Sequence, residues 1–234
     1  NLSWWSHLLL NIKMMPSLNM CGFLYTGADL CGFGADTTED LALRWMQFGA
    51  FTPLMRNHAA LGTREQELYQ FSNSEACGRM VKIRYSLLPY LYSEYMKAAL
   101  RDEMMFRPLA FDYPDDPYAD QIEDQLMVGD SVMIAPVHEQ NTTGRYVYLP
   151  EDMMLVSMRS PEDYTVQAVE KGHHYVPVAM DELIFFVRRN HVIPMAKSAK
   201  SVADMDFEHL SLLGYVTDKA SYELYDDDGN SKDY

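Results

Sequence analysis

Two polar stretches in the first part of the chain decide how it must fold: GADLCGFGADT at residues 27–37 and RNHAALGTREQEL at residues 56–68. Each follows a short apolar run, at residues 21–25 and 51–55, and each of these runs predicts a strand. Polar loops that directly follow strands are where α/β proteins place their functional sites. We therefore expect the functional side chains of this part in these two loops.

Helical patterns surround the two predicted strands. Apolar residues recur at three-to-four spacing from Leu2 to Met15, where Pro16 is expected to end the helix. A second helix is predicted up to Gly49, with Thr37 and Asp40 as a capping box, and a third over residues 74–102. The order helix, strand, helix, strand, helix favours a parallel sheet flanked by helices.

The pattern changes near residue 105. Short β-branched and aromatic runs, such as VMIAPV at 132–137 and LIFFV at 183–187, alternate there with Pro, Gly, Asp and Asn. This spacing is typical of an antiparallel β-sandwich. We therefore predict an α/β domain over residues 1–104, an all-β domain over 105–196, and a short or truncated second β-domain over 197–234.

Composition restricts the partners and the location. The 234 residues include 19 Lys and Arg and 34 Asp and Glu, so the net charge is −15, which repels nucleic acid and anionic lipid. No apolar run approaches the roughly 18 residues of a membrane span. The three cysteines form no CxxC pair and residues 1–15 do not resemble a secretion signal. These features predict no nucleic-acid or membrane partner and a reducing, cytoplasmic location.

Asp29, Arg56 and His58 are the candidate functional residues that the pattern itself supplies. All three stand just past the end of a predicted strand, so they are expected to share one face of the sheet. Two structural alternatives stay open at this point. Asp29 is also a common turn-capping residue, and His58 is also compatible with a hydrogen-bonded loop histidine.

Several motifs together resemble glycoside hydrolase family 31, the α-glucosidase group. They occur in the family's order and cover nearly the whole chain: YTGADLCGF, RWMQFGAF, TPLMRNH, IRYSLLPYLY, RPLAFDYP, GDSVMIAPV and YELYDDDG. The resemblance implies the C-terminal part of a (β/α)8 TIM barrel followed by an antiparallel β-sandwich. It also implies a retaining α-glucosidase that hydrolyses terminal non-reducing α-linked glucose from oligosaccharides, with two aspartates on the barrel as nucleophile and acid/base.

Neither of those aspartates is expected within this chain. The family's nucleophile motif is missing, and Asn1 resembles the last letter of the Gly-Asp-Asn motif that carries the acid/base. The resemblance thus places the acid/base immediately before Asn1. The chain alone is expected to be inactive and to need an upstream portion of the same enzyme, as a separate or continuous chain.

By the same resemblance, Asp29, Phe33, Arg56 and His58 line the pocket for the non-reducing glucose. Cys31 and Asn57 favour glucose over xylose as the bound sugar, because the α-xylosidases of the family tend to have different sequences in these two loops. No metal or other cofactor is expected, and the partner is an α-linked gluco-oligosaccharide. Preference for α-1,4 or α-1,6 linkages does not follow from these residues.

Other features are weaker. Gln66 and Glu67 match a family pair, but Leu68 replaces the usual Pro. The run Asp226–Asn230 is expected to be a turn rather than a calcium loop, and His173 and His174 point to opposite faces of a strand. A solvated edge is the expected role of one group of acids, Asp112, Asp115, Asp116, Asp120 and Asp124. The competing functional hypothesis is a non-catalytic family member that binds sugar or supports another chain.

Overall fold

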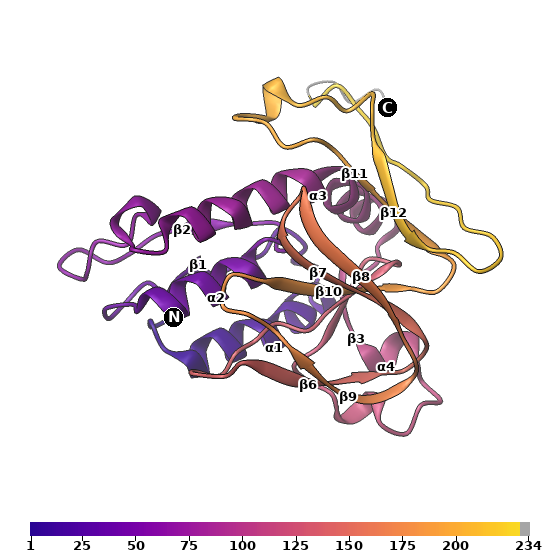
Figure 1. Cartoon of the computed structure of the whole chain (residues 1–234), viewed down its shortest axis with the longest axis horizontal. Helices are drawn as coiled ribbons and strands as arrows, with labels where there is room; N and C mark the ends of the chain where they lie inside the picture. Colours follow the sequence, from indigo (N-terminus) through magenta and orange to yellow (C-terminus); the bar gives the residue numbers. More distant parts are fainter. Residues whose placement is uncertain (230–234) are drawn as a thin grey trace.

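The computed structural model describes residues 1–229 (Figure 1), and its first part follows the predicted order of helices and strands. β1 and β2 pair in parallel, which confirms the expected pairing of this part. The elements in chain order are α1 (Trp5–Met20), β1 (Asp29–Leu30), α2 (Glu39–Gly49), β2 (Arg56–Asn57), the 3-10 turn η1 (Leu68–Gln70) and α3 (Ser74–Arg101).

The predicted positions of the two strands are wrong, because both strands begin after the apolar runs. Residues 21–25 instead close the end of α1: the Phe23 amide bonds the Leu18 carbonyl, and Gly22 takes a positive φ of 83°. Residues 51–55 likewise continue from α2, with the Phe51 amide bonded to the Phe48 carbonyl. These helix-ending bonds use backbone groups that a strand at the same residues would need.

The expected beginning and end of two helices are also corrected. α1 continues through Pro16 to Met20, because its buried face outweighs the loss of one backbone hydrogen bond. The capping box at α2 is wrong: Thr38 occupies the N-cap without a side-chain bond to the helix backbone, and the Thr37 hydroxyl donates to the Thr38 carbonyl. α2 does end at Gly49 as predicted.

The second part of the chain is rich in antiparallel strands, as its sequence pattern predicts. Three short helical segments interrupt them: α4 (Leu109–Asp112), η2 (Ala119–Gln121) and η3 (Val202–Asp204). The strands are β3 (Phe106–Pro108), β4 (Leu126–Val128), β5 (Val132–Ile134), β6 (Gly144–Leu149), β7 (Met153–Ser160), β8 (Asp163–Val169), β9 (Gly172–Pro177), β10 (Leu183–Arg188), β11 (His191–Met195) and β12 (Ser211–Tyr215).

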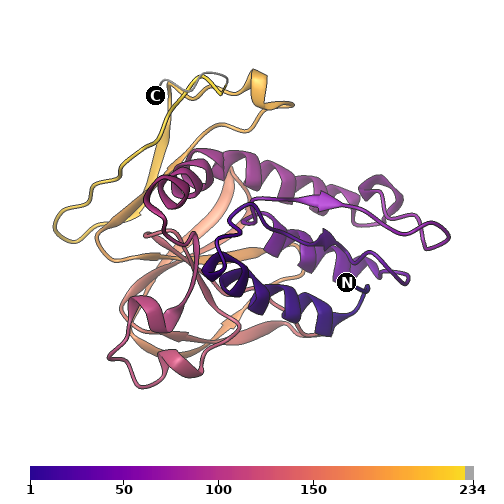
Figure 2. The same ribbon diagram turned by 180° about the vertical axis from the view of Figure 1, so that it is seen from behind.

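A six-stranded sheet in the order β3-β4-β5-β10-β7-β8 lies between the helices and the β6–β9 pair. Residues of β10 alternate between its two faces. Phe185 belongs to the apolar cluster that contains the helices, whereas Phe186 belongs to the cluster shared with β6 and β9. Figure 2 shows α1, α2 and α3 covering one side of this sheet. The helical part is thus fixed to the β part by a shared core.

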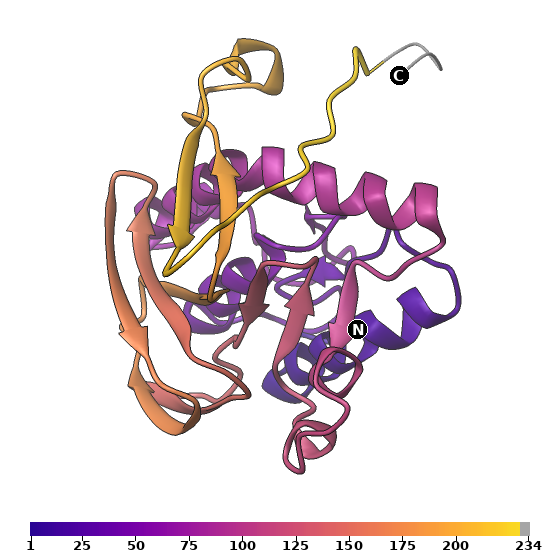
Figure 3. The same ribbon diagram turned by 90° about the vertical axis from the view of Figure 1, so that its right-hand side faces the viewer.

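A buried ion pair fixes α3 to the later chain. The Glu94 carboxylate accepts hydrogen bonds from Lys97 Nζ at 2.8 Å, from the Tyr222 hydroxyl at 2.7 Å and from the Asp130 amide at 3.0 Å. A Cβ on Gly129 would stand 2.1 Å from Glu94 Oε2, so only glycine fits beside this carboxylate. The extended segment that contains Tyr222 runs along α3 (Figure 3).

The predicted domain boundaries stay predictions. One apolar cluster extends from α1 to β11, across residue 104. β11 and β12 pair with each other on either side of the other predicted boundary, at residue 196. Within residues 1–229 no helix combines the length and the apolar character that a membrane crossing requires.

Candidate functional site

The parallel register of β1 and β2 brings Asp29 and Arg56 side by side, at the end where both polar loops begin. Arg56 donates from Nε at 2.8 Å and from Nη2 at 2.5 Å, and both bonds end on Asp29 Oδ1. Asp29 Oδ2 accepts no hydrogen bond from the residues that the structure describes. The Asp29 side chain is 16% exposed, so this oxygen is an acceptor available to a ligand on a largely covered carboxylate.

Phe33 and His58 form the second pair of the site. Their ring centroids are 5.4 Å apart with planes at 38°, and the Ala60 amide donates to the Phe33 carbonyl at 2.8 Å. Both rings remain solvent-accessible. The structure therefore brings each of the four predicted pocket residues to one of two adjacent loops, as a carboxylate with a guanidinium and an aromatic wall with an imidazole.

Asn1 lies against the same loop. Its side-chain amide donates to the Asp29 carbonyl at 2.9 Å, and its own carbonyl accepts the amides of Phe33 and Gly34 at 3.2 and 3.1 Å. These three bonds place the backbone of Asn1 beside Asp29 and Phe33, two of the predicted pocket residues.

Gln66, which the sequence matches to a family pair without giving it a role, is the positioning residue of this site. It is buried, and its Nε2 lies within hydrogen-bond distance of the Leu30, Gly32 and His58 carbonyls. It also donates to Asn57 Oδ1 at 2.9 Å, while Asn57 Nδ2 donates back to the Gln66 carbonyl at 2.6 Å. A single amide thus holds the Asp29 loop to the His58 loop.

Cys31 and Asn57 are the residues that, by the resemblance, favour glucose over xylose. Both have contacts inside the protein. The Asn57 amide is bonded to Gln66, as described above. Cys31 is fully buried with a φ of 67°, and burial, reinforced by nearby Cys77, raises the pKa of its thiol to about 12. A neutral, buried thiol shapes the loop and supplies no nucleophile.

A second set of contacts fixes the outer part of the His58 loop to the start of α2. Arg64 donates from its backbone amide to Asp36 at 2.5 Å and from Nη2 to Glu39 at 3.1 Å. A hydrogen bond from the Ser72 hydroxyl, together with Arg64, holds the pKa of Glu39 below its usual range. Hydrogen bonds from Arg64 therefore join the two polar loops to each other and to the start of α2.

The remaining sequence candidates carry no metal site among residues 1–229. His173 packs against Tyr148, and His174 Nε2 lies 2.8 Å from the Glu170 carbonyl. Asp227 accepts the Gly229 amide at 2.9 Å, as in a turn, whereas Asn230 lies outside the described residues.

The predicted solvated acidic edge is wrong for three of its five members. Asp112 is paired with Arg107, Asp116 with Lys171 and Asp124 with Arg145, each at 2.7–2.8 Å. Their basic partners lie 5, 55 and 21 residues away in the chain. The two long-range pairs, Asp116–Lys171 and Asp124–Arg145, cannot be seen in a local charge pattern.

Comparisons with known proteins identify the family of this chain. Residues 1–94 match the glycosyl hydrolases family 31 TIM-barrel domain, and residues 102–193 match the family 31 C-terminal domain. Alpha-glucosidase 2 of Bacillus thermoamyloliquefaciens is 34% identical over the whole of this chain, which covers 30% of that relative. Lysosomal alpha-glucosidase of Bos taurus is 34% identical over 97% of the chain, which covers 26% of it.

Solved structures show the same fold. The Flavobacterium johnsoniae GH31 dextranase complexed with glucose matches 98% of this chain with a TM-score of 0.82 at 25% identity, and the chain covers 29% of it. A cycloalternan-forming enzyme from Listeria monocytogenes matches 99% of the chain with a TM-score of 0.85 at 24% identity, over 23% of its own length. The chain spans less than a third of each of these proteins, and it belongs to glycoside hydrolase family 31.

Proposed function

We propose that the protein containing this chain is a retaining α-glucosidase and that the chain supplies part of its pocket for the terminal non-reducing glucose. The observation that carries this proposal is the pairing of Asp29 with Arg56 at the start of two parallel strands, with Phe33 and His58 in contact on the loops that follow. The curated relatives named α-glucosidase support it.

This arrangement suits a sugar physically. Asp29 Oδ2 offers a directional acceptor to one hydroxyl group, and the two hydrogen bonds from Arg56 to Oδ1 fix the orientation of the carboxylate. His58 offers ring nitrogens to another hydroxyl, while the Phe33 ring excludes water from an apolar face of the pyranose. Glycoside hydrolysis passes through an oxocarbenium-like transition state, so a fixed negative charge at Asp29 also stabilises the developing positive charge.

We also propose that the acid/base carboxylate immediately precedes Asn1. Asn1 is bonded on both sides to the Asp29–Gly34 loop, so a residue attached to its nitrogen would stand next to the candidate pocket. This relationship supports a role of the chain as one portion of a larger active site.

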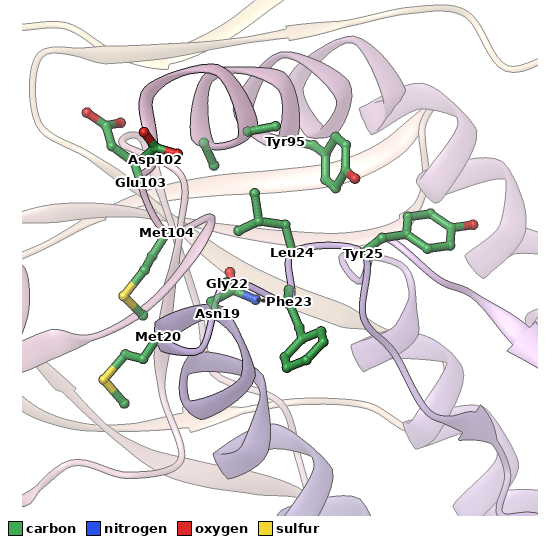
Figure 4. Close-up of a pocket in the computed structure, with 12 residues that line it drawn as sticks. Asn19, Met20, Gly22, Phe23, Leu24, Tyr25, Tyr95, Asp102, Glu103 and Met104 are labelled. Atoms are coloured by element: carbon green, nitrogen blue, oxygen red, sulfur yellow. Dashed lines mark hydrogen bonds between the residues drawn. The ribbon is translucent and has the colours of Figure 1, made fainter.

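The portion upstream of this chain is proposed to complete a (β/α)8 barrel around β1 and β2. These strands pair only with each other among residues 1–229, which leaves both edges of the pair open. Beside them, a hollow of about 700 Å³ lies between the end of α1, the turn at Phe23 and Tyr25, and the end of α3 (Figure 4). Phe23 and Tyr25 are 63% and 66% exposed, and such surfaces favour burial by further chain.

Two experiments test these proposals. The full-length protein, made with its upstream sequence, should release glucose from maltose or isomaltose, with the α-anomer appearing first by NMR. Sugar binding without hydrolysis would instead support the non-catalytic alternative, and β-glucose as first product would exclude retention. The 234-residue chain made alone should aggregate or unfold without cooperativity; monodisperse, cooperatively unfolding material would contradict the need for an upstream portion.

The three cysteines are free thiols, two of them buried, which supports the proposal of a reducing, cytoplasmic location. Fractionation of the source cells, with immunodetection of the full-length protein, tests this placement directly.

A further inference from the structure

The outer face of the β6–β9 pair carries a row of aromatic rings. The register sets Tyr146 opposite Tyr175 and Tyr148 opposite His173, and side chains two residues apart lie on the same face of a strand. The Tyr146 and Tyr175 centroids are 5.2 Å apart, and the Tyr148 and His173 centroids are 4.7 Å apart. Tyr118 continues the row against the second pair.

Exposure distinguishes the two ends of this row. The inward residues of the same strands, Val147 and Val176, are buried in the core between the sheets. Tyr148 is also covered, and its hydroxyl donates to Asp116. Tyr146 and Tyr175, in contrast, are 77% and 51% exposed although they add nothing to that core. Two large rings that contact each other on a paired β-ribbon and are open to solvent are suited to binding.

A cavity of about 360 Å³ opens beside the exposed pair. Tyr146 and Tyr175 form its aromatic wall, with ring planes at 68° to each other. The loop 139–143, between β5 and β6, forms the opposite wall with Glu139, Asn141 and Thr143. Internal bonds order this loop: Thr142 donates to the Glu139 carbonyl at 3.1 Å, and the Val178 amide donates to the Thr143 carbonyl at 3.0 Å.

The floor of the cavity is built from paired charges. Asp124 is paired with Arg145 Nη2 at 2.8 Å, and the same oxygen, Oδ2, lies 3.0 Å from His138 Nε2, so its charge is already compensated within the protein by Arg145. Arg145 is further held by the Pro136 carbonyl at 2.5 Å. With its floor charges already compensated, the cavity is suited to an uncharged ligand with many hydroxyl groups, and the net charge of −15 disfavours an anionic one.

The chemistry of these walls matches a pyranose ring. One face of such a ring presents C–H groups that pack on an aromatic ring, and its rim presents hydroxyls that bond amides, carboxylates and hydroxyl groups. The loop also connects this cavity to the candidate active site. Gln140 donates to Asp40 at 3.2 Å, and Asp40 lies in the first turn of α2, directly after the loop that carries Phe33.

We propose that Tyr146 and Tyr175, with the loop 139–143, form a second carbohydrate-binding site that holds an α-glucan chain on the same side of the protein as the candidate active site. The choice of an α-glucan rests on the proposed function, whereas the presence of a sugar site rests on the aromatic pair and its polar cavity. Such a site would retain a long substrate between successive cleavages at its end.

Affinity electrophoresis of the full-length protein in gels containing soluble starch or dextran tests this site. Starch or dextran should retard the protein, and Tyr146→Ala with Tyr175→Ala should weaken the apparent Kd about tenfold or more. The matched control is Tyr164→Ala, an exposed tyrosine on β8, which should keep normal retardation. Tyr146→Phe with Tyr175→Phe keeps both rings and should largely restore binding.

Two further measurements separate loss of binding from loss of folding or of activity. Thermal unfolding shows whether the alanine variant remains folded, and hydrolysis of 4-nitrophenyl α-glucoside, which is too short to reach the second site, should stay at the wild-type rate. Full retardation of a folded alanine variant, or no retardation of the wild type in either gel, would overturn this inference. Because retardation needs no hydrolysis, an inactive but retarded wild type would count against the proposed function alone.

Discussion

Arg56 directs two nitrogens at one oxygen of Asp29 and leaves the other oxygen, Oδ2, without a protein partner among residues 1–229. The guanidinium therefore fixes the orientation of the carboxylate, while the second oxygen stays available. A ligand-binding role of Asp29 can therefore be distinguished from turn capping by substitution with Asn, because Asn caps a turn equally well.

Asp29→Asn in the full-length enzyme should lower kcat about 100-fold, a barrier increase of roughly 2.7 kcal/mol, because the charge near the oxocarbenium centre is lost. Inhibition by glucose, a ground-state ligand, should weaken only modestly. Steady-state kinetics with glucose inhibition measures both quantities. The control is Glu75→Gln, which removes one member of an exposed ion pair on α3. A near-normal kcat for Asp29→Asn would leave turn capping as the role of this residue.

His58→Ala should reduce kcat/KM by about 2 to 4 kcal/mol of transition-state stabilisation, since its expected partners are sugar hydroxyls whose bonds tighten as the ring flattens. The residue is exposed and contacts Phe33 through its ring, so Tm should change little. Kinetics and thermal unfolding of one preparation test this separation. His209→Ala, in an exposed loop remote in sequence, serves as the control, and wild-type kcat/KM for His58→Ala would remove His58 from the site.

Gln66→Leu should affect both stability and catalysis, because it leaves the Leu30, Gly32 and His58 carbonyls without their shared donor. We expect a loss of about 1 to 3 kcal/mol in the free energy of unfolding, and about a tenfold fall in kcat/KM as the two loops separate. Urea titration and kinetics measure these effects. Gln70→Leu, a nearby glutamine in an exposed position, should be close to neutral. Lost stability with unchanged kcat/KM would restrict Gln66 to folding.

Local patterns were sufficient for the order of helices and strands in the first part of the chain and for placing Asp29, Arg56 and His58 at two neighbouring loops, because strand ends and polar loops are short-range features. They were insufficient for the strand positions: the apolar residues of the run at 21–25 end a helix, and the pairing occurs at Asp29. The burial and positioning role of Gln66 could not be predicted either, since a polar residue in a polar loop shows no periodicity that marks it as buried. Its partners are up to 36 residues away, and only the folded chain defines them.

The Glu94–Lys97 pair provides a stability test away from the site. Both side chains are almost fully covered, so Glu94→Gln leaves a buried ammonium without its counter-charge and should cost about 3 to 5 kcal/mol. The double variant Glu94→Leu with Lys97→Met removes both charges and should be less destabilised than the single one. Urea unfolding of these variants completes the comparison. Glu75, whose side chain is 92% exposed in its pair with Arg79, provides the control: Glu75→Gln should change stability by about 0.5 kcal/mol or less. Equal losses for the single and double variants would contradict a coupled pair.

Asp116 predicts a specific acid sensitivity. Burial alone would raise its pKa, but hydrogen bonds from Lys171 and Tyr148 and the Lys171 charge lower the pKa to about 2, from an ordinary 3.8. Because the folded value lies below the unfolded one, the stabilisation is present above pH 4 and disappears as the pH falls towards 2. Since Lys171 is more than half exposed, we expect the charged Asp116 to stabilise the fold by about 1 kcal/mol rather than by the full equivalent of the pKa shift.

Asp116→Asn should therefore be less stable than the wild type by this amount at pH 6 in urea unfolding, and the difference should shrink at pH 2. The exposed Asp115→Asn serves as the control, and a difference that is constant between the two pH values would show that the Asp116 charge contributes nothing to folding.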